Sequence, residues 1–119
     1  MSNPSRAKGT AYEVLCRDYF QGRGWTECQR LATRAALDLG DLTGIPRVAV
    51  ECRDRQRQEL ARNLDDAEER ARNKGSDFGV CLMKRPRRPV EQSYVLMSLE
   101  TFGRILDELL AEEKQAQSR

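Results

Sequence analysis

Apolar residues three and four positions apart mark three segments of the chain, and this spacing places them on one face of a helix. The first segment runs from Thr10, a suitable N-cap, to Gly22 or Gly24. The second covers residues 58–75 and the third residues 99–114. We therefore expect three amphipathic helices. Their core-facing positions are predicted to be Tyr12, Leu15, Cys16, Tyr19, Leu60, Leu64, Ala67, Ala71, Phe102, Ile105, Leu106, Leu109 and Leu110.

Between these helices the pattern is that of short strands. Residues 25–31 predict a first strand, and residues 41–45 and 48–53 predict two more around a tight turn. The uninterrupted apolar run 78–84 is typical of a buried central strand. Residues 93–98 predict the last strand of the chain.

Two connecting segments have a less regular sequence. The alanines of residues 32–40 suit a helix, although a loop fits the neighbouring segments better, and two prolines make residues 85–92 a loop. The element order is then helix, three strands, helix, two strands, helix. A helix between strands 48–53 and 78–84 is a crossover connection, which favours parallel pairing of those strands. We expect an α/β fold with a mixed β-sheet flanked by helices.

Length and charge add only broad limits. A chain of 119 residues suggests one domain, with its body at 9–112, a flexible basic arm at 1–8 and a polar tail at 113–119. The net charge of +2 says little about partners. No apolar leader begins the chain, and no apolar run reaches the roughly 20 residues of a membrane span, so a cytoplasmic protein is expected.

Histidine is absent, and four cysteines are present. Histidine-dependent catalytic triads and His–Cys zinc sites are therefore excluded. We expect buried free thiols in a reducing compartment, because the cysteines lack C-x-x-C spacing and most have apolar neighbours. A zinc site made of four scattered thiolates is the alternative. Any catalysis has to use carboxylates, cations, hydroxyls, thiols or a bound metal.

The stretch RVAVECRD, residues 47–54, places charge at the end of a predicted buried strand. Because side chains alternate along a strand, Glu51 and Arg53 project from one face and Cys52 from the other. If segment 41–45 pairs with this strand, Asp41 comes close to Glu51. Two carboxylates beside a cation suit Mg²⁺ and the stabilisation of charge on a phosphate under attack. The alternative is a solvated ion pair without chemistry.

These motifs, in their order along the chain, resemble the PD-(D/E)XK nuclease superfamily, and especially the Holliday junction resolvase-like proteins of actinobacteria and their phages. That pattern has an acid at the head of one strand and E-x-K on the next, followed by a helix and a strand. The resemblance covers about residues 9–106. The matching residues are Gly9 and Glu13 in KGTAYE, Asp38, Gly40 and Asp41 in DLGDLTGIP, Glu51 to Asp54 in ECRD, and Lys84 with Arg85.

The resemblance implies a restriction-endonuclease-like core and a metal-dependent, structure-selective DNA endonuclease that resolves Holliday junctions. It implies that Asp41 and Glu51 bind Mg²⁺, for which Mn²⁺ can substitute. It implies further that Glu13 acts on a metal-bound water and that Asp38 steers a neighbouring ligand or cation. Members of the family act as homodimers on branched DNA, in the host cytoplasm where a phage encodes them.

Arg53 departs from the family pattern, which has lysine at this position. An arginine keeps the positive charge but cannot give up its proton, so any general-base role is removed. Three consequences are open. Arg53 replaces the lysine electrostatically with some loss of rate, Lys84 reaches the phosphate instead, or the protein binds DNA without cutting it well.

Cations that flank this motif are the candidates for contact with DNA phosphates, which supply most of the affinity for a duplex. Prolines stiffen the loop at 85–92 and hold its arginines away from the sheet. No base-reading motif is evident, so we expect recognition of DNA shape and backbone. The candidate DNA-binding residues are Arg6, Lys8, Arg55, Arg57, Lys84, Arg85, Arg87 and Arg88.

Three functions are therefore compatible with the sequence. The first is the metal-dependent nuclease, and the second is a non-catalytic protein that binds branched DNA on the same fold. The third is an α/β interaction protein whose charged edge is only a salt-bridge network. Metal-dependent cleavage separates the first from the second, and salt-sensitive DNA binding separates the second from the third.

Overall fold

The computed structural model of the chain describes residues 4–31 and 40–118. Its helices and strands follow the predicted order. The helices are α1 (Pro4–Gly22), α2 (Leu60–Lys74), α3 (Leu99–Leu109) and α4 (Ala111–Gln117), with a 3-10 turn η1 (Val90–Gln92). The strands are β1 (Gln29–Arg30), β2 (Leu42–Thr43), β3 (Val48–Arg53), β4 (Phe78–Met83) and β5 (Tyr94–Leu96).

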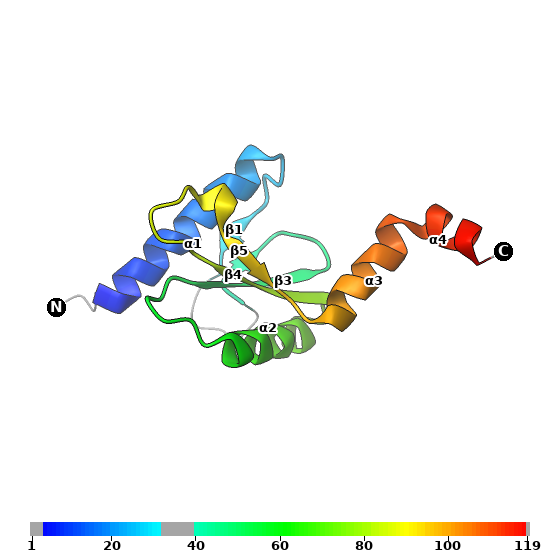
Figure 1. Ribbon diagram of the computed structural model, residues 1–119. Helices are drawn as coiled ribbons and strands as arrows, with labels where there is room; N and C mark the ends of the chain where they lie inside the picture. The colour runs from blue at the N-terminus through cyan, green and yellow to red at the C-terminus, as the bar shows by residue number, and fades with distance from the viewer. Residues whose placement is uncertain (1–3, 32–39, 119) are drawn as a thin grey trace.

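The strands form one mixed sheet in the order β1-β2-β3-β4-β5 (Figure 1). Strands β2 and β3 make the expected antiparallel hairpin, in which Leu42 lies opposite Val50. Strands β3 and β4 run parallel with Glu51 beside Cys81, and β5 returns antiparallel along β4. The predicted α/β fold with a mixed sheet is confirmed. Parallel β3 and β4 bring the loops that follow them to the same edge of the sheet.

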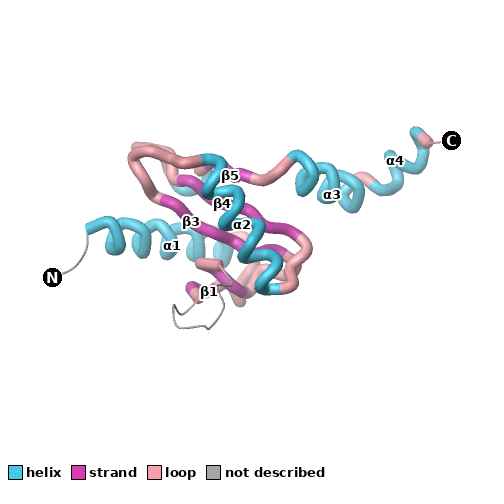
Figure 2. Tube along the Cα trace, turned by 90° about the horizontal axis from the view of Figure 1, so that it is seen from below, coloured by secondary structure: helices cyan, strands magenta, loops and turns pink. Residues whose placement is uncertain are grey.

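Helices α1 and α2 cover opposite faces of this sheet (Figures 1 and 2). The core on the α1 face consists of Tyr12, Cys16, Cys28, Leu42, Val50, Cys52 and Leu82. The buried apolar cluster on the α2 face is smaller and consists of Ala67, Cys81 and Met83. All four cysteines are buried and free, as expected for structural thiols.

Helix α2 packs closely on β4 because Gly79 has no side chain. A Cβ atom at Gly79 would lie 2.4 Å from the carbonyl oxygen of Ala67 and 3.1 Å from Cβ of Ala71. The two alanines of α2 are 0% and 8% exposed, so the contact is made by small residues. Because α2 contacts the sheet through small alanines, polar side chains beside them on the same helix can also reach the sheet.

Some boundaries differ from the prediction. Helix α1 begins at Pro4 rather than at Thr10, so residues 4–8 of the predicted arm are part of this helix. Proline suits the first turn of a helix, where its missing N–H has no intrahelical partner. The first strand shrinks to two residues, and Trp25 at its expected start is 48% exposed. The predicted third helix, 99–114, is divided at Leu110, and residues 111–117 form helix α4, which overlaps the predicted polar tail at 113–119. Residues 32–39, predicted as loop or helix, lie outside the described residues.

Some predicted core positions of the helices are wrong as well. Leu15 and Leu60 are exposed, and α2 turns Asn63 to the sheet instead of Leu60. The Asn63 side-chain nitrogen donates to Oε1 of Gln58 and Sδ of Met83, whereas its buried Oδ1 accepts no hydrogen bond. The apolar residues of α3 are largely exposed, a finding treated below. Within residues 4–31 and 40–118, no helix has the length and apolar character that crossing a membrane requires.

Candidate active site

Strand β3 ends in the three residues that the sequence singled out, and their side chains alternate as predicted. Cys52 lies in the core on the α1 face, next to Val50. Glu51 and Arg53 lie on the opposite face and form ion pairs with residues of α2. Glu51 is only 2% exposed, so it needs compensation by groups of the protein itself.

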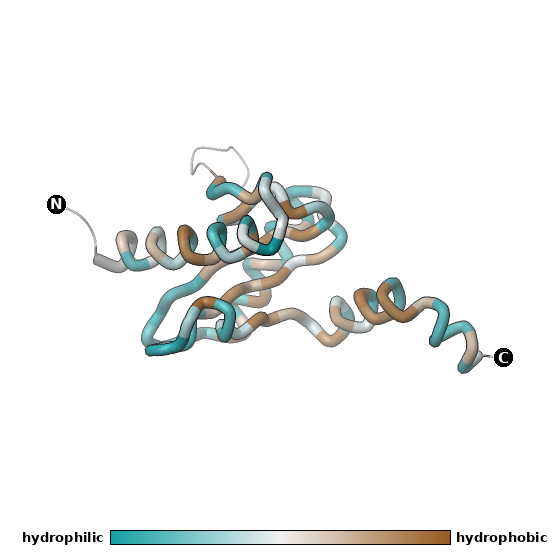
Figure 3. Tube along the Cα trace, turned by 90° about the horizontal axis from the view of Figure 1, so that it is seen from above, coloured by the Kyte–Doolittle hydropathy of each residue, from teal (hydrophilic) through white to brown (hydrophobic). Residues whose placement is uncertain are grey.

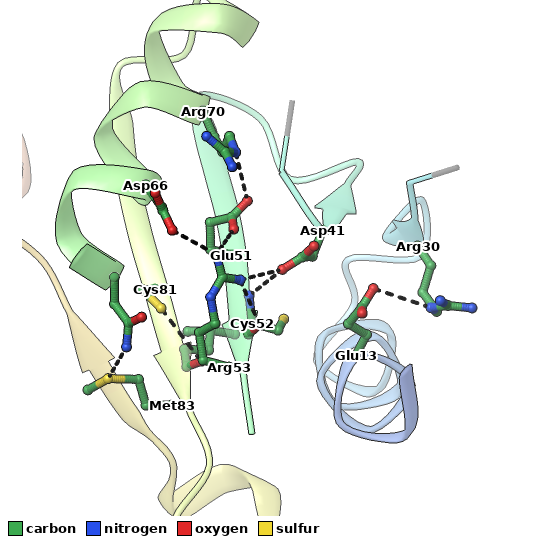
Figure 4. A network of polar contacts seen from close by, with 12 residues as sticks. Glu13, Arg30, Asp41, Glu51, Cys52, Arg53, Asp66, Arg70, Cys81 and Met83 are labelled. Carbon is green, nitrogen blue, oxygen red and sulfur yellow. Dashed lines mark hydrogen bonds and ion pairs between the residues drawn. The ribbon is translucent and has the colours of Figure 1, made fainter. Parts of the chain in front are cut away.

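The guanidinium of Arg53 lies among three carboxylates (Figure 4). Its Nη2 atom is 2.6 Å from Oε2 of Glu51 and 3.2 Å from Oδ2 of Asp66. Its Nη1 atom is 3.2 Å from Oδ2 of Asp41 and donates a hydrogen bond of 2.9 Å to the carbonyl oxygen of Cys52. Burial acts to lower the pKa of Arg53, but the charges of Glu51 and Asp41 outweigh burial and raise it. Arg53 is therefore a permanent cation at the centre of the cluster.

The β2–β3 hairpin holds Asp41 against β3. Gly40 has a φ of 106°, and a Cβ atom there would lie 3.0 Å from the carbonyl oxygen of Val50, so glycine suits this close approach. The backbone N–H of Asp41 donates to that same carbonyl at 2.8 Å. Oδ2 of Asp41 accepts the backbone N–H of Cys52 at 2.7 Å in addition to Arg53. The structure thus brings Asp41 and Glu51 to one cation, as predicted.

Helix α2 contributes two residues that the sequence reasoning missed, Asp66 and Arg70. Asp66 binds Arg53, and Nε of Arg70 lies 3.6 Å from Oε1 of Glu51. Both residues directly precede the alanines that contact the sheet, Ala67 and Ala71. The sequence offered one signal for them. Glu51 and Arg53 are charged residues on a sheet face that a helix covers, and buried charges require charged partners from that helix.

Glu51 has the most perturbed carboxyl group of this cluster. Burial, followed by the nearby charge of Asp41, raises its pKa to about 7, while Arg53 and Arg70 act in the opposite direction. Its Oε1 atom is buried and accepts no hydrogen bond. A buried carboxylate oxygen without a hydrogen bond, next to a second carboxylate, is an environment that favours additional positive charge.

Glu13 lies beside this centre on α1 and is turned toward Arg30 of β1 (Figure 4). The distance from Nε of Arg30 to Oε1 of Glu13 is 3.5 Å. Burial and the charge of Asp41 raise the pKa of Glu13, so the two carboxylates act on one another. The sequence reasoning identified Glu13 but not Arg30. Asp38 lies outside the described residues.

The cations predicted to bind DNA gather at one end of the sheet, beyond the C-terminal ends of β3 and β4. Oδ1 of Asp54 is 3.5 Å from Nζ of Lys8, and Oδ2 of Asp54 is 3.6 Å from Nζ of Lys84. This acid thereby links α1 to both loops at that edge. The guanidinium of Arg85 stacks 5.2 Å from the ring centre of Tyr94.

The remaining cations of this set differ in how far they are exposed. Arg55, Arg57, Arg87 and Arg88 are exposed on the two loops. The side chain of Arg6 lies outside the described part of the chain.

The chemistry of the centre fits a hard divalent cation in part. Across residues 4–31 and 40–118, no three His, Cys, Asp or Glu side chains are gathered closely enough to hold a metal ion. Mg²⁺, however, is commonly bound by one or two carboxylates together with water and substrate phosphates. Asp41 and Glu51 supply two such carboxylates around one point of positive charge, and Glu51 has an oxygen without a hydrogen bond. The residues therefore fit Mg²⁺ provided that Arg53 shifts from between them.

Comparison with known proteins adds no assignment to this geometry. No protein-family model matches the sequence, and neither a curated protein nor a solved structure matches the chain.

Proposed function

We propose that the protein is a metal-dependent, structure-selective endonuclease that hydrolyses phosphodiester bonds of branched DNA, with the four-way junction as its substrate. The observation that carries this proposal is the meeting of Asp41 and Glu51 at the guanidinium of Arg53, with Glu13 alongside. The proposal includes a restriction-endonuclease-like core and a cytoplasmic location. Both follow from the resemblance of the motifs, and the mixed α/β sheet is compatible with them.

In this proposal each charged residue has a separate task. Asp41 and Glu51 would hold Mg²⁺, or Mn²⁺ in its place, which supplies positive charge for the phosphate under attack. Glu13 would accept a proton from the attacking water, and its raised pKa suits a general base. Arg53 would stabilise charge on the phosphate, since it stays protonated and can donate two hydrogen bonds.

The cations at the same end of the sheet would bind the DNA backbone. The loops after β3 and β4 carry exposed arginines, and these loops flank the carboxylate centre because the two strands are parallel. Two prolines restrict the β4–η1 loop and keep its arginines exposed. The substrate would be recognised through backbone and shape, and affinity should fall steeply with salt.

One observation favours a second candidate, a DNA-binding protein with little or no cleavage. Glu51 is contacted by two arginines, Arg53 at 2.6 Å and Arg70 at 3.6 Å, and is 2% exposed. A carboxylate held in this way binds Mg²⁺ only if Arg53 is displaced. Since lysine would make fewer contacts with the acids, Arg53→Lys separates the candidates.

The test is cleavage of a labelled four-way junction and of a linear duplex with the same arms. Each is incubated with Mg²⁺, Mn²⁺ or EDTA, and binding is measured in parallel by gel shift. We expect paired, metal-dependent nicks near the junction, retained or increased in Arg53→Lys. They should be lost in Asp41→Asn and Glu51→Gln, although binding persists. Asp65→Asn, a charge-matched change on the exposed side of α2, is the control and should cleave normally.

The outcomes rank the candidates clearly. Junction binding without cleavage in either metal, for the parent and for Arg53→Lys, would support the DNA-binding candidate and reject the nuclease. Cleavage by Glu51→Gln at the parent rate would show that the nicks come from elsewhere. If DNA is not bound at low salt, both candidates are excluded.

A further inference from the structure

Helix α3 is attached to the rest of the molecule through its polar side. Thr101 is 5% exposed, and Nη2 of Arg104 donates to the carbonyl oxygen of Asp77 at 2.6 Å. On the next turn, Oε1 of Glu108 lies 2.6 Å from Nη2 of Arg47. These polar residues lie three or four positions apart, so one face of the helix makes all of these contacts.

The apolar side of α3 faces away from these contacts and is exposed. Leu99, Leu109 and Phe102 are 85%, 72% and 46% exposed. In Figure 3 this helix is the strongly apolar segment that projects from the body toward the C-terminus. An amphipathic helix normally buries its apolar face, so this orientation is unfavourable for the single chain in water.

The exposed apolar side chains are concentrated in a patch on α3. In the described part of the chain, nine large hydrophobic side chains are exposed, and six of them lie between positions 94 and 110. Four of these six belong to the α3 segment, namely Leu99, Phe102 and Leu109 on α3 and Leu110 directly after it. The other two, Tyr94 and Val95, are consecutive on β5 and project from opposite faces of the sheet, so they do not extend this patch as one surface. Exposed apolar side chains gathered on one helix in this way mark an interaction surface.

Charge indicates what kind of partner covers the patch. The segment formed by α3 and α4 carries five acids, Glu100, Asp107, Glu108, Glu112 and Glu113, against two cations, Arg104 and Lys114. Helices that lie on anionic membranes have basic polar faces, and nucleic acids repel acidic ones. The partner is therefore a protein surface.

The spacing of the apolar residues suits pairing with an identical helix. Leu99, Phe102, Leu106 and Leu109 follow one another at intervals of three, four and three, the spacing of a helix–helix seam. The positions beside this seam are Gly103 and Ile105 within α3 and Leu110 directly after it, none of which is charged. Two copies related by a two-fold axis can thus meet along α3 without opposing like charges.

We infer that the apolar face of α3 is the surface through which two copies of this chain form a dimer. Leu99, Phe102, Leu109 and Leu110, each offering on the order of 100 Å², supply about half of the ~800 Å² that one partner of a standard interface buries. Arg47 and Asp77, which anchor α3, precede β3 and β4, whereas Arg53 and Lys84 lie at the opposite ends of these strands. The dimer would therefore leave both carboxylate centres open.

The test is the mass of the full chain in solution, measured by sedimentation equilibrium without DNA or metal. We expect a dimer for the parent. Leu99→Glu combined with Leu109→Glu should weaken association by at least about 100-fold, since two leucines that the dimer would bury are replaced by charges. Leu60→Glu changes an equally large residue that is 55% exposed on α2, and this matched control should stay dimeric. Because no DNA is present, the result does not depend on the proposed nuclease activity.

Two results would overturn the inference. One is a parent chain that stays monomeric at a concentration of about 10 μM. The other is a double variant that dimerises as well as the parent, which would place the interface elsewhere. If the double variant is unfolded, as judged by loss of its helical circular dichroism signal, hydrogen exchange of the parent tests the dimer surface instead. Protection of α3 amides that increases with protein concentration supports the inference, and protection independent of concentration contradicts it.

Discussion

The end of strand β3 and helix α3 depart from the usual distribution of polar and apolar residues in opposite ways. At the end of β3, the carboxylate of Glu51 and the guanidinium of Arg53 lie between the sheet and α2, and Glu51 is 2% exposed. On α3, Leu99 is 85% exposed, although the helix has a clear apolar face. Charge is inside in one region, and apolar surface is outside in the other.

The two regions differ in whether the unusual side chains find partners within the same chain. The buried charges at β3 have charged partners from the β2 segment and α2 within the same chain, although Oε1 of Glu51 accepts no hydrogen bond. On α3, polar side chains bind the rest of the chain, while Leu99, Phe102 and Leu109 of its apolar face stay exposed. The first region therefore belongs to the stability and chemistry of the single chain, and the second to its association.

The largest expected change in stability comes from breaking the ion-pair network at the end of β3. Arg53→Met removes the cation 2.6 Å from Glu51 and leaves a buried carboxylate with Arg70 alone at 3.6 Å. Loss of one partner from a buried ion pair costs about 3–5 kcal/mol, so urea unfolding at alkaline pH should show a decrease of this size. Arg57→Met, in an exposed position of the next loop, should change stability by no more than about 0.5 kcal/mol. Equal stability of both variants would mean that the network does not stabilise the fold.

A second change tests the close packing of α2 against the loose attachment of α3. Gly79→Ala places a Cβ atom 2.4 Å from the carbonyl oxygen of Ala67 and should destabilise the protein by about 3 kcal/mol, because backbone has to move. Gly103→Ala, on α3, meets no atom within 4 Å and should stabilise the helix by about 0.5–1 kcal/mol. Thermal unfolding at one protein concentration measures both. A neutral Gly79→Ala would show that α2 can shift without cost.

The smallest effect concerns pH. The folded protein raises the pKa of Glu51 from 4.5 to about 7, so it favours the protonated carboxyl group. The stability contributed by this group is fully present below the unfolded pKa and is lost as pH rises through the folded pKa. Between about pH 5 and about pH 7.5, the parent should therefore lose about 2 kcal/mol of stability relative to Glu51→Gln. Parallel stability curves for the two proteins would contradict the raised pKa.

The sequence predicted the parts that depend on local periodicity. Alternation along β3 separated Glu51 and Arg53 from Cys52, and the short turn before β3 predicted that Asp41 would come near Glu51. It could not identify Asp66 and Arg70 as partners, since this depends on which side of α2 faces the sheet. The prediction had turned Leu60 inward, but the close contact at Gly79 admits only the small residues of α2 together with Asn63.

By itself, the sequence determined the order of the elements, the mixed sheet with parallel β3 and β4, and the residues that share a strand face. These features follow from local spacing and from the geometry of a crossover connection. Only the tertiary structure decided that Arg53 joins three carboxylates and that the apolar side of α3 faces solvent. The physical reason is the same in both cases. A periodic pattern states which residues of an element share a face, but the packing of distant segments decides what that face meets.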